Sequence, residues 1–321
     1  MNNPWTRLAA VAAAVGLAVT AMSSGPSSAH PSALAGLPHP HVMPIDVPGR
    51  EKPLVSLPIV GVPPTPTPLI SGGGPILASP KVYLVFWGWG GQDTDGVRAK
   101  MIDFFSGVGG SAWQGVTTQY DGTVNGQQVQ ITNPVGQLAG TWDDDTNAIH
   151  NNLSFQELAE EAGRAVAHFN GGTPDANANY FVATPKNFND AQFNQQQYCA
   201  WHDYTTASSY PGVTPGIAFT NMPYVLNMGT SCGRQAVNAG TAGFLDGVTI
   251  VAGHEYLEAV TDPDVSTGWT DLLFNENADK CAWVKAGPGK MTNVTLSSGT
   301  FAVQGTWSNK DLNGLGACAT S

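Results

Sequence analysis

Basic residues are scarce in this 321-residue chain, and their scarcity limits its partners. Lysine and arginine number 13 against 24 aspartates and glutamates, which gives a formal net charge of −11. Because phosphate backbones are bound mainly through lysine and arginine, we expect no nucleic acid partner. An acidic chain is well suited to solubility and attracts divalent cations.

Several catalytic and metal-binding motifs are absent. No G-x-S-x-G occurs, which argues against a serine hydrolase, and the Gly72-Gly73-Gly74 run lacks the Lys-Ser/Thr of a phosphate loop. The four cysteines contain no C-x2-C pair, so a zinc site built from thiolates alone is disfavoured.

Only one long apolar run is present, from Leu8 to Met22, after Arg7 and before the small residues ending at Ala29. This layout predicts a signal peptide over residues 1–29. The alternative, a membrane anchor, is disfavoured because a span needs about 20 apolar residues. We therefore expect a secreted, extracellular monomer with no membrane segment in its mature form.

Proline and glycine dominate residues 30–72, which predicts a disordered leader or pro-segment outside the fold. Residues 73–321 are then expected to form a single globular domain. Four cysteines allow three pairings. Export permits disulfides, and we favour the two pairs closest in sequence, Cys199 with Cys232 and Cys281 with Cys318.

The sequence predicts an α/β (α+β) fold, a zincin-like metallohydrolase-type domain with a β-rich, disulfide-closed C-terminal segment. The helices are expected to begin at good capping residues, and the strands to be rich in β-branched and aromatic residues. Expected helices cover Asp95–Phe105, Phe155–Phe169 after the cap Ser154, and Gly247–Val260 after the cap Asp246; expected strands cover Lys81–Trp89, Asn179–Thr184, Asn293–Leu296 and Thr300–Val303. The span Asn187–Ala242 is expected to form long ordered loops.

The third of these helices carries His254-Glu255-Tyr256-Leu257-Glu258. Residues four apart share a helix face, so His254 and Glu258 can bind one metal ion. Glu255 lies beside that face, where H-E-x-x-H zinc hydrolases place their general base. Replacing the second histidine by Glu258 preserves a site for zinc and makes calcium or another divalent ion more competitive.

A third ligand is needed, and several residues compete for the role. Glu276 ranks first, because its segment resembles the downstream Asn-Glu of thermolysin-like gluzincins, in which that Glu is a ligand and a later Asp, here Asp279, orients the first histidine. His202 ranks second. Asp264, with a metzincin-like spacing, and Asp262 follow.

A bare His-Glu-x-x-Glu also arises by chance on solvated helices. The apolar residues before His254 favour a buried helix instead, on which charged groups need partners or a metal.

A family resemblance connects these segments. The segments GGPILASPKVYLVFWGW from Gly73, YCAWHDY from Tyr198, GHEYLEAVTDP from Gly253 and ADKC from Ala278 are similar to the Exordium (phosphate-induced) family of secreted proteins and its bacterial relatives. The resemblance also implies the pairing of Cys281 with Cys318. The residues of this chain that match the family's candidate site positions are His202, His254, Glu255, Glu258, Asp262, Glu276 and Asp279.

Two functions remain open. The first is a zincin-like metallopeptidase acting on a peptide or protein, in which His254, Glu258 and Glu276 hold zinc and Glu255 is the general base. Tyr204, His202 or Tyr224 would then stabilise the oxyanion. The second, which the resemblance implies, is a non-enzymatic, wall-associated binding or signalling protein. The enzyme needs a groove over His254 and Glu255, whereas the second function predicts that both are buried.

Overall fold

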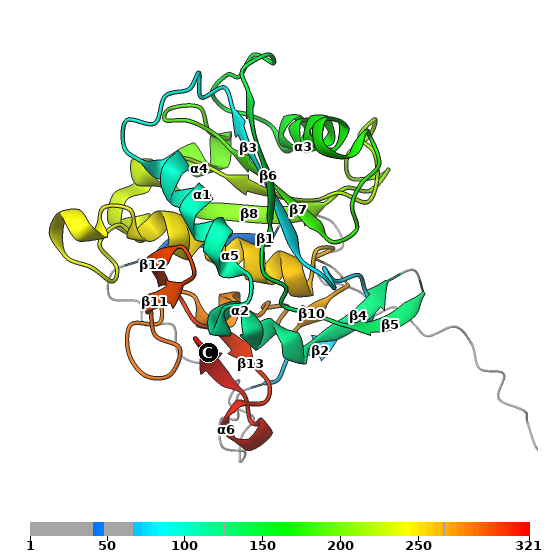
Figure 1. The fold of residues 1–321 in the computed structure, drawn as a ribbon, viewed down its shortest axis with the longest axis vertical. Helices are drawn as coiled ribbons and strands as arrows, with labels where there is room; N and C mark the ends of the chain where they lie inside the picture. The colour runs from blue at the N-terminus through cyan, green and yellow to red at the C-terminus, as the bar shows by residue number, and fades with distance from the viewer. Residues whose placement is uncertain (1–40, 48–66, 125, 266) are drawn as a thin grey trace, which may run out of the picture. The chain divides into compact units, whose positions relative to one another are not determined.

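A six-stranded mixed sheet forms the centre of the fold (Figure 1). The computed structural model describes residues 41–47, 67–124, 126–265 and 267–321. Strands follow the order β1-β8-β9-β7-β3-β6. The last four are parallel, whereas β8 is antiparallel to both of its neighbours, β1 and β9. Their bounds are β1 His41–Pro44, β8 Tyr198–Tyr204, β9 Ala218–Met222, β7 Ala178–Ala183, β3 Lys81–Trp87 and β6 Leu138–Asp144.

Helices cover both faces of this sheet. Successive strand residues point to opposite faces. On β8, the ring of Trp201 packs on Phe155 at the start of one helix, and the next residue, His202, contacts Glu255 on another. The first helix is α3, Phe155–Asn170; the second is α5, Asp246–Thr261, which packs beside α1, Val97–Val108.

Smaller elements complete the chain around α5. Four two-stranded sheets are formed by β2 Ile70–Ser71 with β10 Trp269–Thr270, β4 Asp121–Val124 with β5 Gln127–Gln130, β11 Thr292–Leu296 with β12 Gly299–Val303, and β13 Thr306–Ser308 with β14 Ala317–Ala319. Short helices are α2 Ala112–Gly115, α4 Ala191–Asn194 and α6 Asp311–Gly314. The 3-10 helices are η1 Val116–Gln119, η2 Val225–Cys232, η3 Gly240–Gly243 and η4 Asp279–Cys281.

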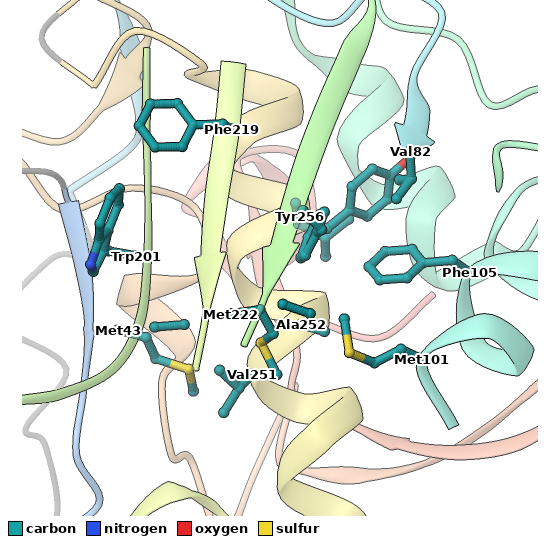
Figure 2. Packing of buried hydrophobic residues seen from close by; sticks show 14 of the residues in the cluster. Met43, Val82, Met101, Phe105, Trp201, Phe219, Met222, Val251, Ala252 and Tyr256 are labelled. Atoms are coloured by element: carbon teal, nitrogen blue, oxygen red, sulfur yellow. The ribbon is translucent and has the colours of Figure 1, made fainter. Parts of the chain in front are cut away.

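The core lies between α5 and the sheet. All sixteen residues of α5 are buried, and Tyr256 meets Phe105 of α1 edge-on (Figure 2). Phe105 packs in turn on Phe181 of β7. Burying each large apolar side chain contributes about 1.5–3 kcal/mol, so α5 is held in place by packing on every side. No helix in the described part of the chain is long and apolar enough to cross a membrane.

The predicted mixed α/β composition and both predicted disulfides are confirmed, whereas the zincin-like form of the domain stays a prediction. Helices hold 29% and strands 25% of the described residues, a mixed α/β composition. Cys199 is bonded to Cys232, and Cys281 to Cys318.

The elements with strong local signals also appear. The capping box of Ser154 and Glu157 begins α3, and Gly171 ends it in a left-handed conformation. The helix α1 begins at Val97, two residues later than predicted. The carboxylate of Asp93 accepts hydrogen bonds from the backbone amides of Arg98 and Ala99 and so supports this first turn.

Two local predictions are wrong. Asp246 is the first residue of α5 and does not cap it; its carboxylate accepts hydrogen bonds from the amides of Val237 and Asn238. The span Asn187–Ala242 is not only loop, because it contains β8 and β9. Both strands are buried on the two sides of the sheet, so tertiary packing overrides their weak local pattern.

The predicted leader is partly inside the fold. Residues 41–44 form β1, Met43 is fully buried, and Leu69 joins the core. An edge strand tolerates proline, which explains why a proline-rich stretch can extend the sheet. The domain therefore begins before residue 73, and the predicted signal peptide lies outside the described residues.

Candidate metal centre

The middle of α5 places His254 and Glu258 on one face. Nε2 of His254 lies 3.1 Å from Oε1 of Glu258, one helical turn later. Both side chains are fully buried. The predicted convergence of these two residues is therefore present.

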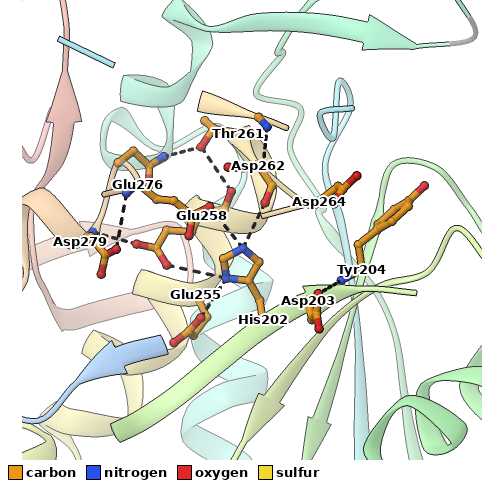
Figure 3. Close-up of polar contacts among 12 residues, drawn as sticks. His202, Asp203, Tyr204, Glu255, Glu258, Thr261, Asp262, Asp264, Glu276 and Asp279 are labelled. Carbon is orange, nitrogen blue, oxygen red and sulfur yellow. Dashed lines mark hydrogen bonds and ion pairs between the residues drawn. The ribbon is translucent and has the colours of Figure 1, made fainter. Parts of the chain in front are cut away.

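Asp279 completes this group of three (Figure 3). Its Oδ1 lies 3.7 Å from Nε2 of His254, and its backbone N–H donates to Oε1 of Glu258 over 2.8 Å. One possible ligand atom from each of these residues lies within 4.8 Å of the other two. We refer to His254, Glu258 and Asp279 as the α5–η4 triad.

The segment that carries Asp279 is tied firmly to α5. The side-chain amide of Asn277 donates to the carbonyl of Leu257 and to the hydroxyl of Thr261. The disulfide between Cys281 and Cys318 holds the end of η4. These contacts fix the position of Asp279 although it lies 25 residues after His254 in the sequence.

His202 reaches the same region from β8. Its Nδ1 lies 3.1 Å from Oε2 of Glu255, and its Nε2 lies 3.1 Å from the backbone carbonyl of Asp262. The backbone carbonyl can only accept, so Nε2 is the donor to Asp262, and Nδ1 shares a proton with the carboxyl group of Glu255. Burial acts to lower the pKa of His202, but the charges of Glu276 and Glu255 outweigh it and raise the pKa well above its usual value. His202, Glu255 and Glu258 also form a second group of three whose possible ligand atoms all lie within 4.8 Å of one another.

Glu255 is oriented by this imidazolium. Its Oε2 is held by His202, whereas its Oε1 has no hydrogen-bond partner among the described residues. Burial raises the pKa of Glu255 to about 7, although its contact with His202 opposes the rise. A buried carboxylate with one anchored and one open oxygen is suited to proton transfer near neutral pH.

Glu276 and Asp262 lie at the Nε2 side of the His202 ring, opposite the side that contacts Glu255. Oε1 of Glu276 lies 3.5 Å from Nε2 of His202. Burial raises the pKa of Asp262 well above its usual value, and the nearby charge of Glu276 adds to the rise. Glu276, ranked first by spacing, is thus placed next to His202, and Asp279 takes the position beside His254.

The other candidates lie elsewhere. The charge of Asp264 acts on Asp203 and Tyr204, where it adds to the rise of their pKa values, and Figure 3 shows Tyr204 directed away from Glu255. The hydroxyl of Tyr224 donates to Asp95. Neither tyrosine is thereby placed to assist chemistry at Glu255.

The donor chemistry of the α5–η4 triad suits a divalent metal. One imidazole and two carboxylates are a common ligand set for zinc with a fourth position left for water, and the two carboxylates also suit harder ions. Several carboxylates are buried close together, and the pKa values of Glu255 and Asp262 are raised. A bound cation would reduce the electrostatic repulsion between these carboxylates.

All of these groups are enclosed by protein. His254, Glu255, Glu258, His202 and Glu276 are each fully buried. A cavity of about 300 Å³ lies near the start of α5, where Lys100 and Asp246 line it, and neither His254 nor Glu255 is among its lining residues.

No family model, curated protein or solved structure matches this chain. The resemblance to the Exordium family therefore stays a prediction from the sequence, and function has to be argued from the site.

Proposed function

We propose that this chain is an exported metal-dependent hydrolase of zincin-like type that cleaves peptide bonds. The proposal rests on one observation: His254 and Glu258 of the buried helix α5 lie close to Asp279 of η4, and the same helix carries Glu255 next to His254. In this proposal, Asp279 replaces Glu276 as the third ligand. Zinc is the proposed ion.

Each residue of the site has a role in this mechanism. His254, Glu258 and Asp279 would hold the metal ion, which would supply Lewis-acid activation of a water molecule. Glu255 would accept a proton from the water as its oxygen adds to the peptide carbonyl carbon, and would return that proton to the amine as the C–N bond breaks. The imidazolium of His202 keeps Glu255 in place through Oε2.

The surroundings of the site support the proposal. The helix with the motif packs against the strand β8, which supplies His202 to the contact with Glu255. Two disulfides are typical of an oxidising compartment, which favours export.

The second candidate is a non-enzymatic extracellular protein in which the same residues form a structural site. One observation favours it: His254 and Glu255 are fully buried and held by neighbouring side chains. A purely structural site requires no route for substrate.

Metal analysis of the purified chain and four variants tests the proposal. We expect about one zinc per parent chain, and at least about tenfold weaker binding in His254→Ala and Asp279→Asn because each loses a ligand. Glu255→Gln should keep the metal and lose about 10²- to 10⁴-fold of the hydrolysis of labelled casein, since it removes the general base. Asp264→Asn is the matched control and should change neither.

The outcomes separate the two candidates. Equal zinc binding by the parent and His254→Ala would show that the triad is not the site. Full hydrolysis by Glu255→Gln would exclude Glu255 as the base. A chain that binds zinc through the triad and cleaves no casein, even when cut within residues 48–66 as described below, is the non-enzymatic protein.

A further inference from the structure

The strand β1 comes from the proline-rich leader, yet it occupies one edge of the central sheet. Its partner is β8, in antiparallel register, with His41 opposite His202 and Met43 opposite Ala200. The other side of β8 pairs with β9. If β1 were removed, β8 would become the edge strand and expose a row of backbone donors and acceptors.

This edge lies directly beside the candidate site. Residues two apart on a strand share a face, so Met43 lies on the same side of the sheet as His202. Met43 is fully buried, β1 contacts α5, and in Figure 2 the Met43 side chain is directed towards the part of α5 that carries Val251. Val251 is one turn before Glu255, so β1 covers the approach to the site from this edge.

Apolar packing of Val42 and Ile45, hydrogen bonds and one ion pair hold β1 and the residues after it to other described residues. The indole N–H of Trp283 donates to the carbonyl of Pro44 over 2.7 Å, and the amide of Asp46 donates to the carbonyl of Ser231. Lys285 pairs with Asp46 at 2.9 Å, an ion pair that is partly exposed and therefore weak. Pro44 has no N–H, and the pairing register shifts at this residue. Among the described side chains of β1, Met43 is the one that is fully buried, so release of this short edge strand would uncover one fully buried side chain.

We propose that residues 41–46 occupy a peptide-binding edge of β8 within the intact chain and that their release opens the site. An extended peptide would then pair with β8 in the antiparallel register that β1 now uses, next to His202 and Glu255. Backbone hydrogen bonds would provide affinity, and the position of Met43 predicts a preference for an apolar side chain there. The inference rests on the proposed hydrolase function and specifies how its site is closed.

Tethering explains why the edge is closed in the intact chain. A tethered segment has an effective concentration on the order of millimolar, so a free peptide at micromolar concentration does not displace it. Cutting the tether removes this advantage. Binding of a free peptide should therefore depend on the cut.

The test uses the full chain with a specific protease site placed within residues 48–66 and the substitution Glu255→Gln, so that the probe is not consumed. The probe is a fluorescent peptide with the sequence of residues 40–46, Pro-His-Val-Met-Pro-Ile-Asp. We expect at least about tenfold tighter binding after the cut, and loss of that binding when the peptide carries Asp at the Met43 position. Equal binding before and after the cut, or no binding after it, would overturn the inference.

A second pair of variants tests the closure without cutting. Met43→Asp should loosen β1 because it places a charge in an apolar site, whereas Val47→Asp changes a residue that is 39% exposed in the same segment. Hydrogen exchange of the amides of residues 198–204 should become at least about tenfold faster in Met43→Asp only. Equal exchange in both variants contradicts the proposed role of β1.

Failure of this inference can be told apart from failure of the proposed function. Peptide binding after the cut, with no casein hydrolysis by the cut parent chain, would support the edge and reject the hydrolase. Equal hydrolysis by cut and uncut chains, with no peptide binding, would keep the hydrolase and reject the closure by β1.

Discussion

Buried carboxylates outside the candidate site also carry energetic consequences. Glu161 of α3 is fully buried, next to Arg164 and Asp144. Burial raises the pKa of Glu161 to about 7, while the charge of Arg164 opposes the rise. The folded chain therefore holds a proton at Glu161 at pH values where the unfolded chain, with a pKa near 4.5, has released it.

This shift predicts a pH dependence of stability. Because the folded state binds more protons between about pH 4.5 and 7, the contribution of Glu161 to the free energy of unfolding falls as pH rises through that window. Glu161→Gln should remove this contribution and flatten the curve, whereas Glu160→Gln, at an exposed neighbouring position, should leave it unchanged. Urea unfolding of the three chains from pH 5 to 8 measures the difference. Parallel curves for the parent and Glu161→Gln would contradict the assignment.

At the scale of elements, the close packing of α5 depends on a glycine next to the motif. A Cβ at Gly253 would lie 2.8 Å from the ring of Trp113 and 3.3 Å from that of Phe104. Trp113 is fully buried and has its indole N–H bonded to the carbonyl of Gln304, so it cannot yield easily. Gly163 of α3 provides the contrast, because its nearest contact would be an ordinary 3.5 Å to Val213.

The two glycines should respond oppositely to the same substitution. Gly253→Ala should lower the free energy of unfolding by about 1–3 kcal/mol through overpacking, and weaken metal binding because His254 follows directly. Gly163→Ala should raise it by up to about 1 kcal/mol, since alanine is the better helix former. Thermal and urea unfolding of both variants measure the signs. Stabilisation by Gly253→Ala would mean that Trp113 moves freely and that the α5 packing is not tight.

At the scale of the molecule, the two disulfides close loops of similar size with different relations to the site. Cys199 and Cys232 are 33 residues apart, and Cys281 and Cys318 are 37 apart. Loops of this length predict a loss of about 3–4 kcal/mol when either bond is removed. Only the second bond lies at the end of η4, the element that begins with Asp279.

Serine replacement of each pair should separate stability from metal binding. Both double variants should lose stability by a similar amount. The chain without Cys281 and Cys318 should also bind zinc at least about tenfold more weakly, because Asp279 is no longer fixed, whereas the chain without Cys199 and Cys232 should retain its zinc affinity. Calorimetric titration with zinc after unfolding controls measures this. Equal losses of affinity in both variants would disprove the special role of the second disulfide.

Local signals were sufficient for part of this architecture. The capping box of Ser154 and Glu157 predicted the start of α3, and the four-residue spacing of His254 and Glu258 predicted their shared face. Both predictions succeed because helix geometry is decided by neighbours within one or two turns. The pairing of nearby cysteines was predictable for a similar reason, since short loops close most easily.

Only the tertiary structure decided which groups meet. His202 and Glu255 are 53 residues apart, and their contact depends on the packing of the strand β8 over the helix α5. The polar residues around β8 prevented its prediction from the sequence. The position of Asp279 beside His254 depends on how Asn277 anchors the downstream segment to α5. The entry of β1 into the sheet depends on a free strand edge that no local pattern encodes. Such contacts are set by long-range packing, because side-chain convergence is decided by the relative placement of whole elements and not by the spacing of residues along the chain.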